Sequence, residues 1–442
     1  MQFILLFGFI WLIWFVFFRP RKRPGPAFTD VRSVEKDLPA SRRYNPERYF
    51  RLKKGIFIGL DQQGKPIYVN KERYRKTHTQ LLGITGSGKG VAASVLLAQS
   101  AIDGEAVFVF DPKDDEFMPR VLGRIAKNNR IPFHLIDLRP DAPPQFNIFN
   151  GASEHEIEEM LVAGFDLSEK GDIADVYRLE DRKAAALLAQ IAVNSSAQRP
   201  RHLMELARQD KEIVRAKKFW AELEELSGLD CIDAESGFDL SKVLSEGGIV
   251  YLLGSTRYNR TVKLQKMVLL RIMQLIERRD RSNTPRYAVL FLDELKYLLS
   301  SEALRALGTV RDKYAHVILA HQSLGDLRDC GNLNPQAVEG ALDNTGLKLV
   351  YRVNAPLTAQ WASRLTGQVR AYRDNVSASR FKDGSWSEAQ RPLFDENMFL
   401  RLPDMTGVLI GDGLAKSVNV SPLPADNERP MPVAIRTVVD SI

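Results

Sequence analysis

Short apolar runs recur along the chain and alternate with longer segments of helical periodicity. Continuous apolar runs of this kind are typical of strands that are buried on both faces. Strands that alternate with helices predict an α/β fold with a mainly parallel sheet covered by helices on both faces. The runs that we expect to form strands are residues 106–110, 133–137, 248–253, 287–292, 316–320 and 347–351.

Two regions depart from this alternation. Residues 55–69 contain two alternating segments around a polar, glycine-containing turn, which predicts a small β-hairpin. Residues 152–232 contain no strand run, and helical periodicity is clear at 174–192 and 217–226. We therefore expect an all-helical insertion, and insertions of this kind usually carry partner recognition while the core carries the chemistry.

The first 18 residues carry no charge and are almost wholly apolar, and the basic cluster Arg19-Pro-Arg-Lys-Arg23 follows at once. This length reaches the lower limit for a helix that spans a bilayer. Because positively charged flanks stay in the cytoplasm, we expect one N-terminal transmembrane helix with the bulk of the chain cytoplasmic. Attachment at the membrane interface, or a second span, is the alternative.

The segment Gly83-Ile-Thr-Gly-Ser-Gly-Lys-Gly90 follows an apolar run and precedes a helical pattern. Its spacing is that of a P-loop, in which backbone N–H groups at a helix N-terminus surround phosphate oxygens and the lysine reaches the β- and γ-phosphates. The sequence therefore predicts a nucleotide site, with ATP as the ligand. The residues assigned to this site are Gly83, Thr85, Gly86, Ser87, Gly88, Lys89, Gly90 and Val91.

One position departs from the usual P-loop. The residue after Lys89 is normally Ser or Thr, whose hydroxyl is a ligand of Mg²⁺, but here it is Gly90. Either the metal is held by other groups and water, or nucleotide binding persists with weakened hydrolysis. The identification of a hydrolytic site therefore depends more than usual on carboxylates elsewhere in the chain that could bind Mg²⁺ and activate water.

The strand predicted at 287–292 ends in two adjacent carboxylates, Asp293 and Glu294. At the carboxyl end of a parallel strand, Asp293 would bind Mg²⁺ and Glu294 would orient or deprotonate the attacking water. A core strand followed by the acidic first turn of a helix is the alternative.

The strand predicted at 316–320 leads to Gln322, which we expect to sense the γ-phosphate. A hydrogen bond from this amide to a neighbouring loop is the alternative. Arg305 and Arg311 lie between the two strands, near a predicted helix end. Either is a solvated charge or an arginine finger that reaches a neighbouring subunit's nucleotide.

Composition narrows the location and the partners. The chain of 442 residues is 44% hydrophobic, which is enough for two domains, and its two cysteines indicate a reducing compartment. The net charge of +7 is uneven, because residues 19–76 contain 17 basic and 6 acidic residues and carry +11, which leaves −4 for the remainder. This basic stretch favours anionic lipid headgroups as its contact, with nucleic acid as the second reading.

Several motifs together resemble the type IV secretion system coupling proteins, the TraG/TraD-type ATPases of conjugation, which belong with the RecA-like FtsK/HerA motors. That family has an all-alpha insertion between the P-loop and the Asp-Glu strand, and residues 152–232 match it in position. One branch of the family also has the Gly-Lys-Gly-Val variant found at residues 88–91. The segments that carry the resemblance are 59–68, 83–91, 110–114, 292–295, 320–324 and 344–352.

The resemblance implies a RecA-like P-loop NTPase fold and an ATPase of the bacterial inner membrane that uses ATP and Mg²⁺. It implies a homo-hexamer that recruits a relaxase–DNA complex, the relaxosome, and drives single-stranded DNA toward a type IV secretion channel. It also favours Arg311 over Arg305 as the finger, because the spacing of Arg311 to Gln322 resembles the family's. The expected segments are a transmembrane anchor (1–18), a basic linker (19–45), the first part of the nucleotide-binding domain (46–151), the all-alpha insertion domain (152–236) and the second part of the nucleotide-binding domain (237–442).

Two other functions stay open from the sequence. One is a membrane-anchored DNA pump of the FtsK/HerA kind that acts in chromosome or phage DNA movement. The other is a non-hydrolysing adaptor that binds nucleotide as a structural ligand and recruits protein substrates, and its support is the glycine at position 90.

Overall fold

The computed structural model of the protein describes residues 38–169, 171–195, 198–235, 237–328, 333, 335–343, 345–375 and 385–433. The transmembrane helix predicted at 1–18, and most of the linker predicted at 19–45, lie outside these residues. Within the described part of the chain, no helix combines the length and the apolar character needed to cross a membrane.

The strands form an 11-stranded sheet and a separate two-stranded hairpin. Their bounds are β1 (Ile56–Leu60), β2 (Pro66–Val69), β3 (His78–Leu82), β4 (Ala106–Asp111), β5 (Phe133–Asp137), β6 (Gly248–Leu253), β7 (Ala288–Leu292), β8 (Ala315–His321), β9 (Thr345–Val350), β10 (Gln368–Asn375), β11 (Ser385–Pro392), β12 (Thr406–Ile410) and β13 (Lys416–Asn419). The order across the large sheet is β2-β1-β13-β12-β9-β3-β8-β7-β4-β6-β5, and β10 pairs with β11.

The part of the large sheet from β9 to β5 is wholly parallel. This confirms the predicted α/β fold with a mainly parallel sheet, and all six strand runs predicted from the sequence form strands in it. The hairpin predicted at 55–69 is also confirmed, as β1 and β2. The antiparallel strands β12 and β13, which join this hairpin to β9, were not predicted.

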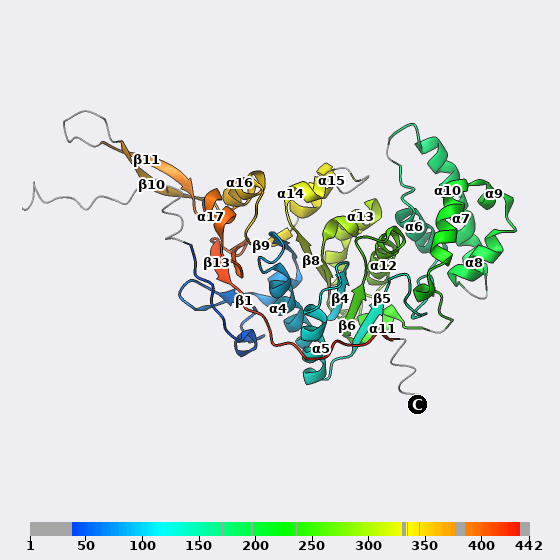
Figure 1. The fold of residues 1–442 in the computed structure, drawn as a ribbon, viewed down its shortest axis with the longest axis horizontal. Helices are drawn as coiled ribbons and strands as arrows, with labels where there is room; N and C mark the ends of the chain where they lie inside the picture. Colours follow the sequence, from blue (N-terminus) through cyan, green and yellow to red (C-terminus); the bar gives the residue numbers. More distant parts are fainter. Residues whose placement is uncertain are drawn as a thin grey trace, which may run out of the picture.

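Helices lie between the strands along the chain. Their bounds are η1 (Pro46–Tyr49), α3 (Lys71–Arg75), α4 (Lys89–Ile102), α5 (Met118–Asn129), α6 (Glu154–Gly164), α7 (Asp175–Asn194), α8 (Pro200–Ala207), α9 (Lys211–Arg215), α10 (Lys217–Ser227), η2 (Asp230–Ile232), α11 (Leu240–Glu246), α12 (Asn259–Glu277), η3 (Leu295–Tyr297), α13 (Ser301–Val310), η4 (Arg311–Lys313), α14 (Leu324–Arg328), α15 (Pro335–Asp343), α16 (Pro356–Leu365) and α17 (Glu396–Arg401). The elements labelled η are 3₁₀ helices. In Figure 1 the β10–β11 hairpin projects at one end of the molecule and helices α6 to α10 gather at the other.

Apolar cores cover both faces of the sheet. Successive side chains of a strand point to opposite faces. In β4, Phe108 and Phe110 accordingly pack in the core that contains α12 and α13, while Val107 and Val109 pack in the core that contains α4 and α5. The sheet is therefore held between two helical layers, as predicted.

The residues from 152 to 232 that the structure describes contain helices and no strand, which confirms the helical character of this insertion. Its apolar side chains belong to the same core as α12. The guanidinium of Arg271 on α12 bonds to the carboxylate of Glu156 at 3.3 Å and to the carbonyl of Asn150 at 2.9 Å. The insertion is therefore packed onto the sheet-covering helices, and the predicted domain boundaries stay a prediction.

Candidate nucleotide site

The phosphate-binding loop lies where the sequence predicts, between the end of β3 and the start of α4. Gly88 is the residue before α4, and its φ of 122° is unfavourable for any residue with a side chain. A Cβ atom at Gly88 would also approach the Cα of Met405 to 3.1 Å. This position therefore requires glycine both for its conformation and for its closeness to the backbone at residue 405.

The departure at Gly90 has a different cause. Gly90 lies inside α4 with an ordinary helical backbone, and the nearest atom to an added Cβ is the Cε of Met118 at 3.9 Å. Neither conformation nor space requires glycine there. The missing hydroxyl is therefore a chemical difference and not a structural necessity.

Lys89 is the cation of the loop, and only 7% of it is exposed. Its ammonium donates to the carbonyl oxygen of Gly83 and, at 3.1 Å, to that of Ile84. Burial lowers the pKa of Lys89 to about 8, although the nearby Asp293 opposes this shift. The loop thus holds a buried positive charge whose hydrogen-bond partners are neutral carbonyls.

Asp293 and Glu294 follow β7, as predicted. Burial raises the pKa of Asp293 to about 6, and the positive charge of Lys113 opposes the rise. Glu294 is 4% exposed and adopts a left-handed conformation with φ of 46°. Because this region is costly for residues other than glycine, the surrounding structure must hold Glu294 in place.

Two donors meet at one oxygen of Glu294. The side-chain amide of Gln322 donates to Glu294 Oε1 at 3.0 Å, and the ammonium of Lys113 forms an ion pair with the same atom. Burial pushes the pKa of Glu294 upward, but the hydrogen bonds from Lys113 and Gln322 outweigh it, so the pKa is lowered. The structure therefore brings Gln322 next to Glu294, as the adjacent strands β7 and β8 require.

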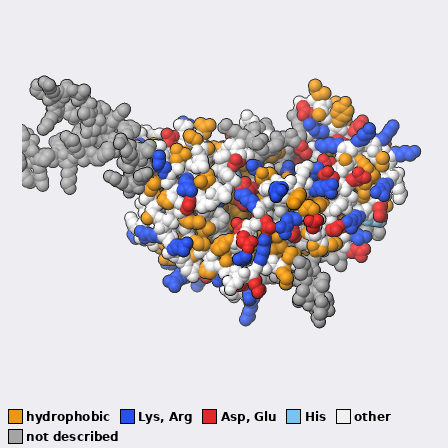
Figure 2. Space-filling view, in the orientation of Figure 1, with side chains coloured by type: hydrophobic (Ala, Val, Ile, Leu, Met, Phe, Trp, Pro, Cys, Tyr) orange, Lys and Arg blue, Asp and Glu red, His pale blue; other side chains and the backbone are white. Residues whose placement is uncertain are grey.

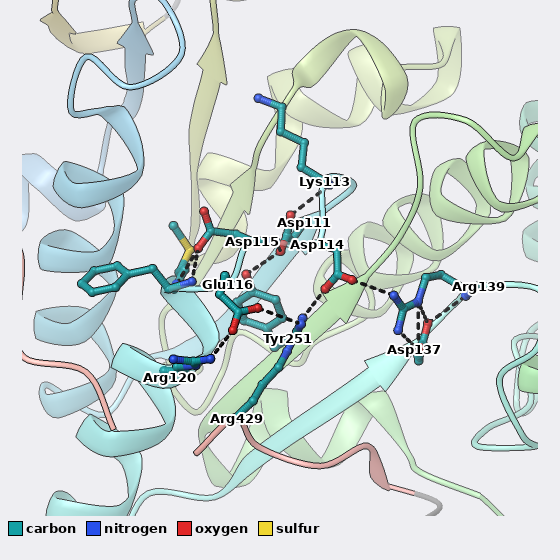
Figure 3. Close-up of polar contacts among 12 residues, drawn as sticks. Asp111, Lys113, Asp114, Asp115, Glu116, Arg120, Asp137, Arg139, Tyr251 and Arg429 are labelled. Atoms are coloured by element: carbon teal, nitrogen blue, oxygen red, sulfur yellow. Dashed lines mark hydrogen bonds and ion pairs between the residues drawn. The ribbon is translucent and has the colours of Figure 1, made fainter. Parts of the chain in front are cut away.

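The turn after β4 is a part of the site that the sequence analysis did not assign (Figure 3). The carboxylate of Asp111 accepts the backbone N–H groups of Lys113 at 3.0 Å and Asp115 at 2.7 Å, and the hydroxyl of Tyr251 at 2.7 Å. The signal was available, because Asp111-Pro-Lys113 ends a buried strand in the same way as Asp293-Glu294 does.

These elements enclose a cavity of about 420 Å³. The P-loop, Lys113 and Asp293 contribute to its polar lining. Its apolar wall consists of the side chains of Val91, Phe117, Met118, Phe291, Met405 and Pro422. The volume and the combination of charged and apolar lining are typical of a site for a small organic ligand with a charged end.

The two candidate arginine fingers do not line this cavity. Arg311 lies in η4, just before β8 begins, whereas Gln322 follows the end of the same strand. Arg311 therefore lies at the amino ends of the parallel strands, whereas Lys89 lies at their carboxyl ends. The side chain of Arg311 is 53% exposed. Arg305 is 74% exposed and pairs with Glu302 at 3.1 Å.

Two family models match consecutive parts of the chain. The model described as the central domain of helicase HerA matches residues 56–230, and the model described as type IV secretory system conjugative DNA transfer matches residues 230–416. The P-loop falls in the first match, and the Asp-Glu strand falls in the second.

A curated relative is Mobilization protein A from Escherichia coli, which is 33% identical to the chain over 360 residues. The match covers 79% of this chain and 66% of that protein, so the chain spans just under two thirds of the relative's length.

Solved structures show the same fold at low sequence identity. The bacterial conjugative coupling protein TrwB in an unbound form is 16% identical, with a TM-score of 0.65, over 89% of this chain and 96% of that one. TrwB in complex with ADP and Mg²⁺ is 17% identical, with a TM-score of 0.63, over 88% of this chain and 95% of that one. VirB4 of Thermoanaerobacter pseudethanolicus is 14% identical, with a TM-score of 0.58, over 84% of this chain and 97% of that one.

The two family matches together extend from residue 56 to residue 416, and they agree with the curated relative and with the fold. In sequence the chain is similar to type IV secretion coupling proteins and to HerA-type proteins of the FtsK/HerA family, and in fold it is similar to the coupling protein TrwB.

Proposed function

We propose that the protein is an ATP-hydrolysing coupling protein that brings a relaxase–DNA complex to a type IV secretion channel and drives single-stranded DNA transfer in conjugation. The observation that carries the proposal is the arrangement around one cavity. A P-loop lysine, Lys89, and a strand-end carboxylate, Asp293, line it, and Glu294 with its partner Gln322 follows directly behind. This set contains the groups that phosphoryl transfer to water requires.

The residues of the cavity fit a nucleotide with Mg²⁺. Among the residues that the structure describes, the buried ammonium of Lys89 donates to two carbonyl oxygens, and a phosphate oxygen is a stronger acceptor for it. The carboxylate of Asp111 is occupied by three donors from the protein, which leaves Asp293 as the strand-end carboxylate for a hard cation. The apolar wall suits the base. TrwB was solved with ADP and Mg²⁺, and we extend both ligands to this chain.

Each residue then has a defined task. Lys89 and the N–H groups of its loop bind the phosphates, and Asp293 holds the cation, which supplies positive charge to the transferring phosphoryl group. Glu294 accepts a proton from the attacking water, and the amide of Gln322 keeps that carboxylate oriented. Arg311 precedes β8 and does not line this cavity, so its proposed role is on the nucleotide of a neighbouring subunit in a ring, which we take to be a hexamer.

The distribution of charge on the surface suits a motor that contacts the DNA phosphates at a few places. Figure 2 shows Lys and Arg side chains interspersed with Asp and Glu over this face of the molecule, without one continuous basic patch. We therefore expect DNA to be bound in the assembled ring by a limited set of phosphate contacts, with an affinity that falls steeply with salt and depends little on sequence. The proposed location is the bacterial inner membrane, with residues 1–18 as the anchor.

The test is ATP turnover by the full-length protein in lipid vesicles, with and without single-stranded DNA. Lys89→Ala and Glu294→Gln should each reduce turnover by about 10²-fold or more, because one removes phosphate binding and the other removes the base. Matched controls are Lys76→Ala and Glu72→Gln, whose side chains are 65% and 81% exposed and pair with each other at 3.7 Å. Full turnover by either site variant would refute the hydrolytic motor, and tight ATP binding without turnover by the unmodified protein would favour the adaptor.

A further inference from the structure

One cation of the cavity has no task in the proposed reaction. Lys113 lines the cavity together with Lys89 and Asp293, and its ammonium forms an ion pair with Glu294 Oε1. The ammonium of Lys113 therefore lies between the cavity proposed for the phosphates and Glu294, the carboxylate proposed to bind the attacking water. The amide of Gln322 donates to the same oxygen of Glu294.

The backbone that carries Lys113 is fixed on both sides. Asp111 holds the turn through three hydrogen bonds, two of them from backbone N–H groups. On the other side Asp114 has a left-handed φ of 60°, and its carboxylate is paired with Arg139 at 2.7 Å and with Arg429. The root of the lysine side chain is therefore held in one place.

The side chain of Lys113 is partly exposed and is held at its ammonium by the ion pair with Glu294. Figure 3 shows Lys113 extending away from the cluster that Asp114 forms with Arg139 and Arg429. Its side chain is 36% exposed, and four rotatable bonds separate its ammonium from the fixed backbone. Rotation of the Lys113 side chain can therefore carry its ammonium from one acceptor to another while the backbone of the turn after β4 stays in place.

The two acceptors have opposite consequences for the reaction. The ammonium of Lys113 and the amide of Gln322 meet at Glu294 Oε1, so this oxygen is engaged by two donors and is less available to accept a hydrogen bond from water. A terminal phosphate offers more negative charge and three acceptor oxygens, so it competes strongly for the same ammonium. Transfer of Lys113 to the phosphate would free Glu294 Oε1 to accept a hydrogen bond from the attacking water.

We propose that Lys113 exchanges its ammonium between Glu294 and the γ-phosphate of the bound nucleotide, so that it both detects a triphosphate and releases the catalytic carboxylate. The proposal rests on the proposed ATPase function and adds a residue to it. With Lys113 on the phosphate, Glu294 accepts the proton of the attacking water as the new oxygen–phosphorus bond forms and the bond to the ADP oxygen breaks. With ADP in the site, the ammonium stays on Glu294.

The test measures binding and not turnover. Affinities for fluorescent ATPγS and fluorescent ADP are measured at fixed Mg²⁺ on the full-length protein and on Lys113→Gln, Lys113→Arg and Lys76→Gln. Lys113→Gln should reduce the preference for ATPγS over ADP roughly tenfold, because one charge-assisted hydrogen bond to the γ-phosphate is lost. Lys113→Arg should keep most of the preference, and Lys76→Gln should keep all of it.

A second variant examines the competition directly. Glu294→Gln removes the negative charge that holds Lys113, so it should strengthen binding of ATPγS relative to ADP several-fold, and this gain should vanish in Lys113→Gln/Glu294→Gln. The proposal is overturned if Lys113→Gln leaves the preference unchanged, if it weakens both nucleotides equally, or if the gain from Glu294→Gln persists without Lys113. Absence of saturable binding of either nucleotide by the unmodified protein would instead remove the proposed function, and the inference with it.

Discussion

The buried carboxylate of Asp293 should make the protein less stable while it serves the metal. Burial raises the pKa of Asp293 to about 6, whereas an aspartate in an unfolded chain titrates near 4. The folded state therefore binds the proton more tightly than the unfolded state, and the free energy of unfolding falls as the pH rises from about 4 to about 6. Above pH 6 the destabilisation is complete. We predict that Asp293→Asn raises stability at neutral pH and abolishes Mg²⁺-dependent turnover.

The size of the effect follows from the pKa difference. Two pH units at ~1.4 kcal/mol each correspond to about 3 kcal/mol. With an unfolding entropy of about 2.1 cal/mol/K per residue over about 400 residues, this is an increase of about 3–4 °C in Tm. By the same linkage, the gain in the free energy of unfolding from Asp293→Asn should be about half as large at pH 5.

The assay is thermal unfolding of the protein and of Asp293→Asn between pH 5 and pH 8, with EDTA and without nucleotide. Asp312→Asn is the matched control, because the Asp312 side chain is 74% exposed and should leave Tm unchanged at every pH. A gain for Asp293→Asn that does not shrink on acidification would refute the reasoning. A loss of stability at pH 8 would show that Asp293 is held by favourable contacts stronger than its burial cost.

Three further predictions concern the loop, the insertion and the assembly. Gly90→Ser should be tolerated and should raise the affinity for Mg²⁺ with nucleotide, because the position is helical and open; loss of nucleotide binding in a titration would contradict this. Exchange of residues 152–232 for the equivalent region of a relative should change which cargo is transferred in mating assays while basal ATPase activity is kept; lost activity with unchanged cargo would place the insertion in the motor core. Arg311→Ala should bind ATP normally but hydrolyse it ~10³-fold more slowly, and mixing it with Lys89→Ala should restore part of the turnover. A co-assembled mixture no more active than its components would remove Arg311 from the site.

The sequence was sufficient wherever the signal is local. Strands buried on both faces appear as unbroken apolar runs, so β4 to β9 could be located from their residues alone. The chemistry at their carboxyl ends could be located as well, because Asp293, Glu294 and Gln322 each follow such a run directly. Parallel pairing then places these side chains at one edge of the sheet, which is how the contact between Glu294 and Gln322 could be anticipated.

Contacts between distant segments could not be predicted in this way. Lys113 follows β4 and Glu294 follows β7, and nothing in either segment shows that the ammonium meets the carboxylate. Met405 and Pro422 enter the cavity from the antiparallel end of the chain, whose short strands β12 and β13 carry too little periodicity to be recognised. The position of Arg311 could have been inferred, because it precedes the strand predicted at 316–320 whereas Gln322 follows that strand, and the two ends of a strand lie at opposite ends of the sheet.

The position of β3 within the sheet has a consequence for how the protein is made. Its neighbours are β8 and β9, and the contact between Gln80 and His321 joins residues that are 241 positions apart. The strand that presents the predicted phosphate-binding loop therefore has no partner in the sheet until the ribosome has passed β8, which ends at His321. Non-local pairing of this kind forms late and slowly. A nascent chain that ends before β8 should bind no nucleotide, so ATP cannot guide the early folding of the domain, and binding becomes a sign that synthesis has passed β8.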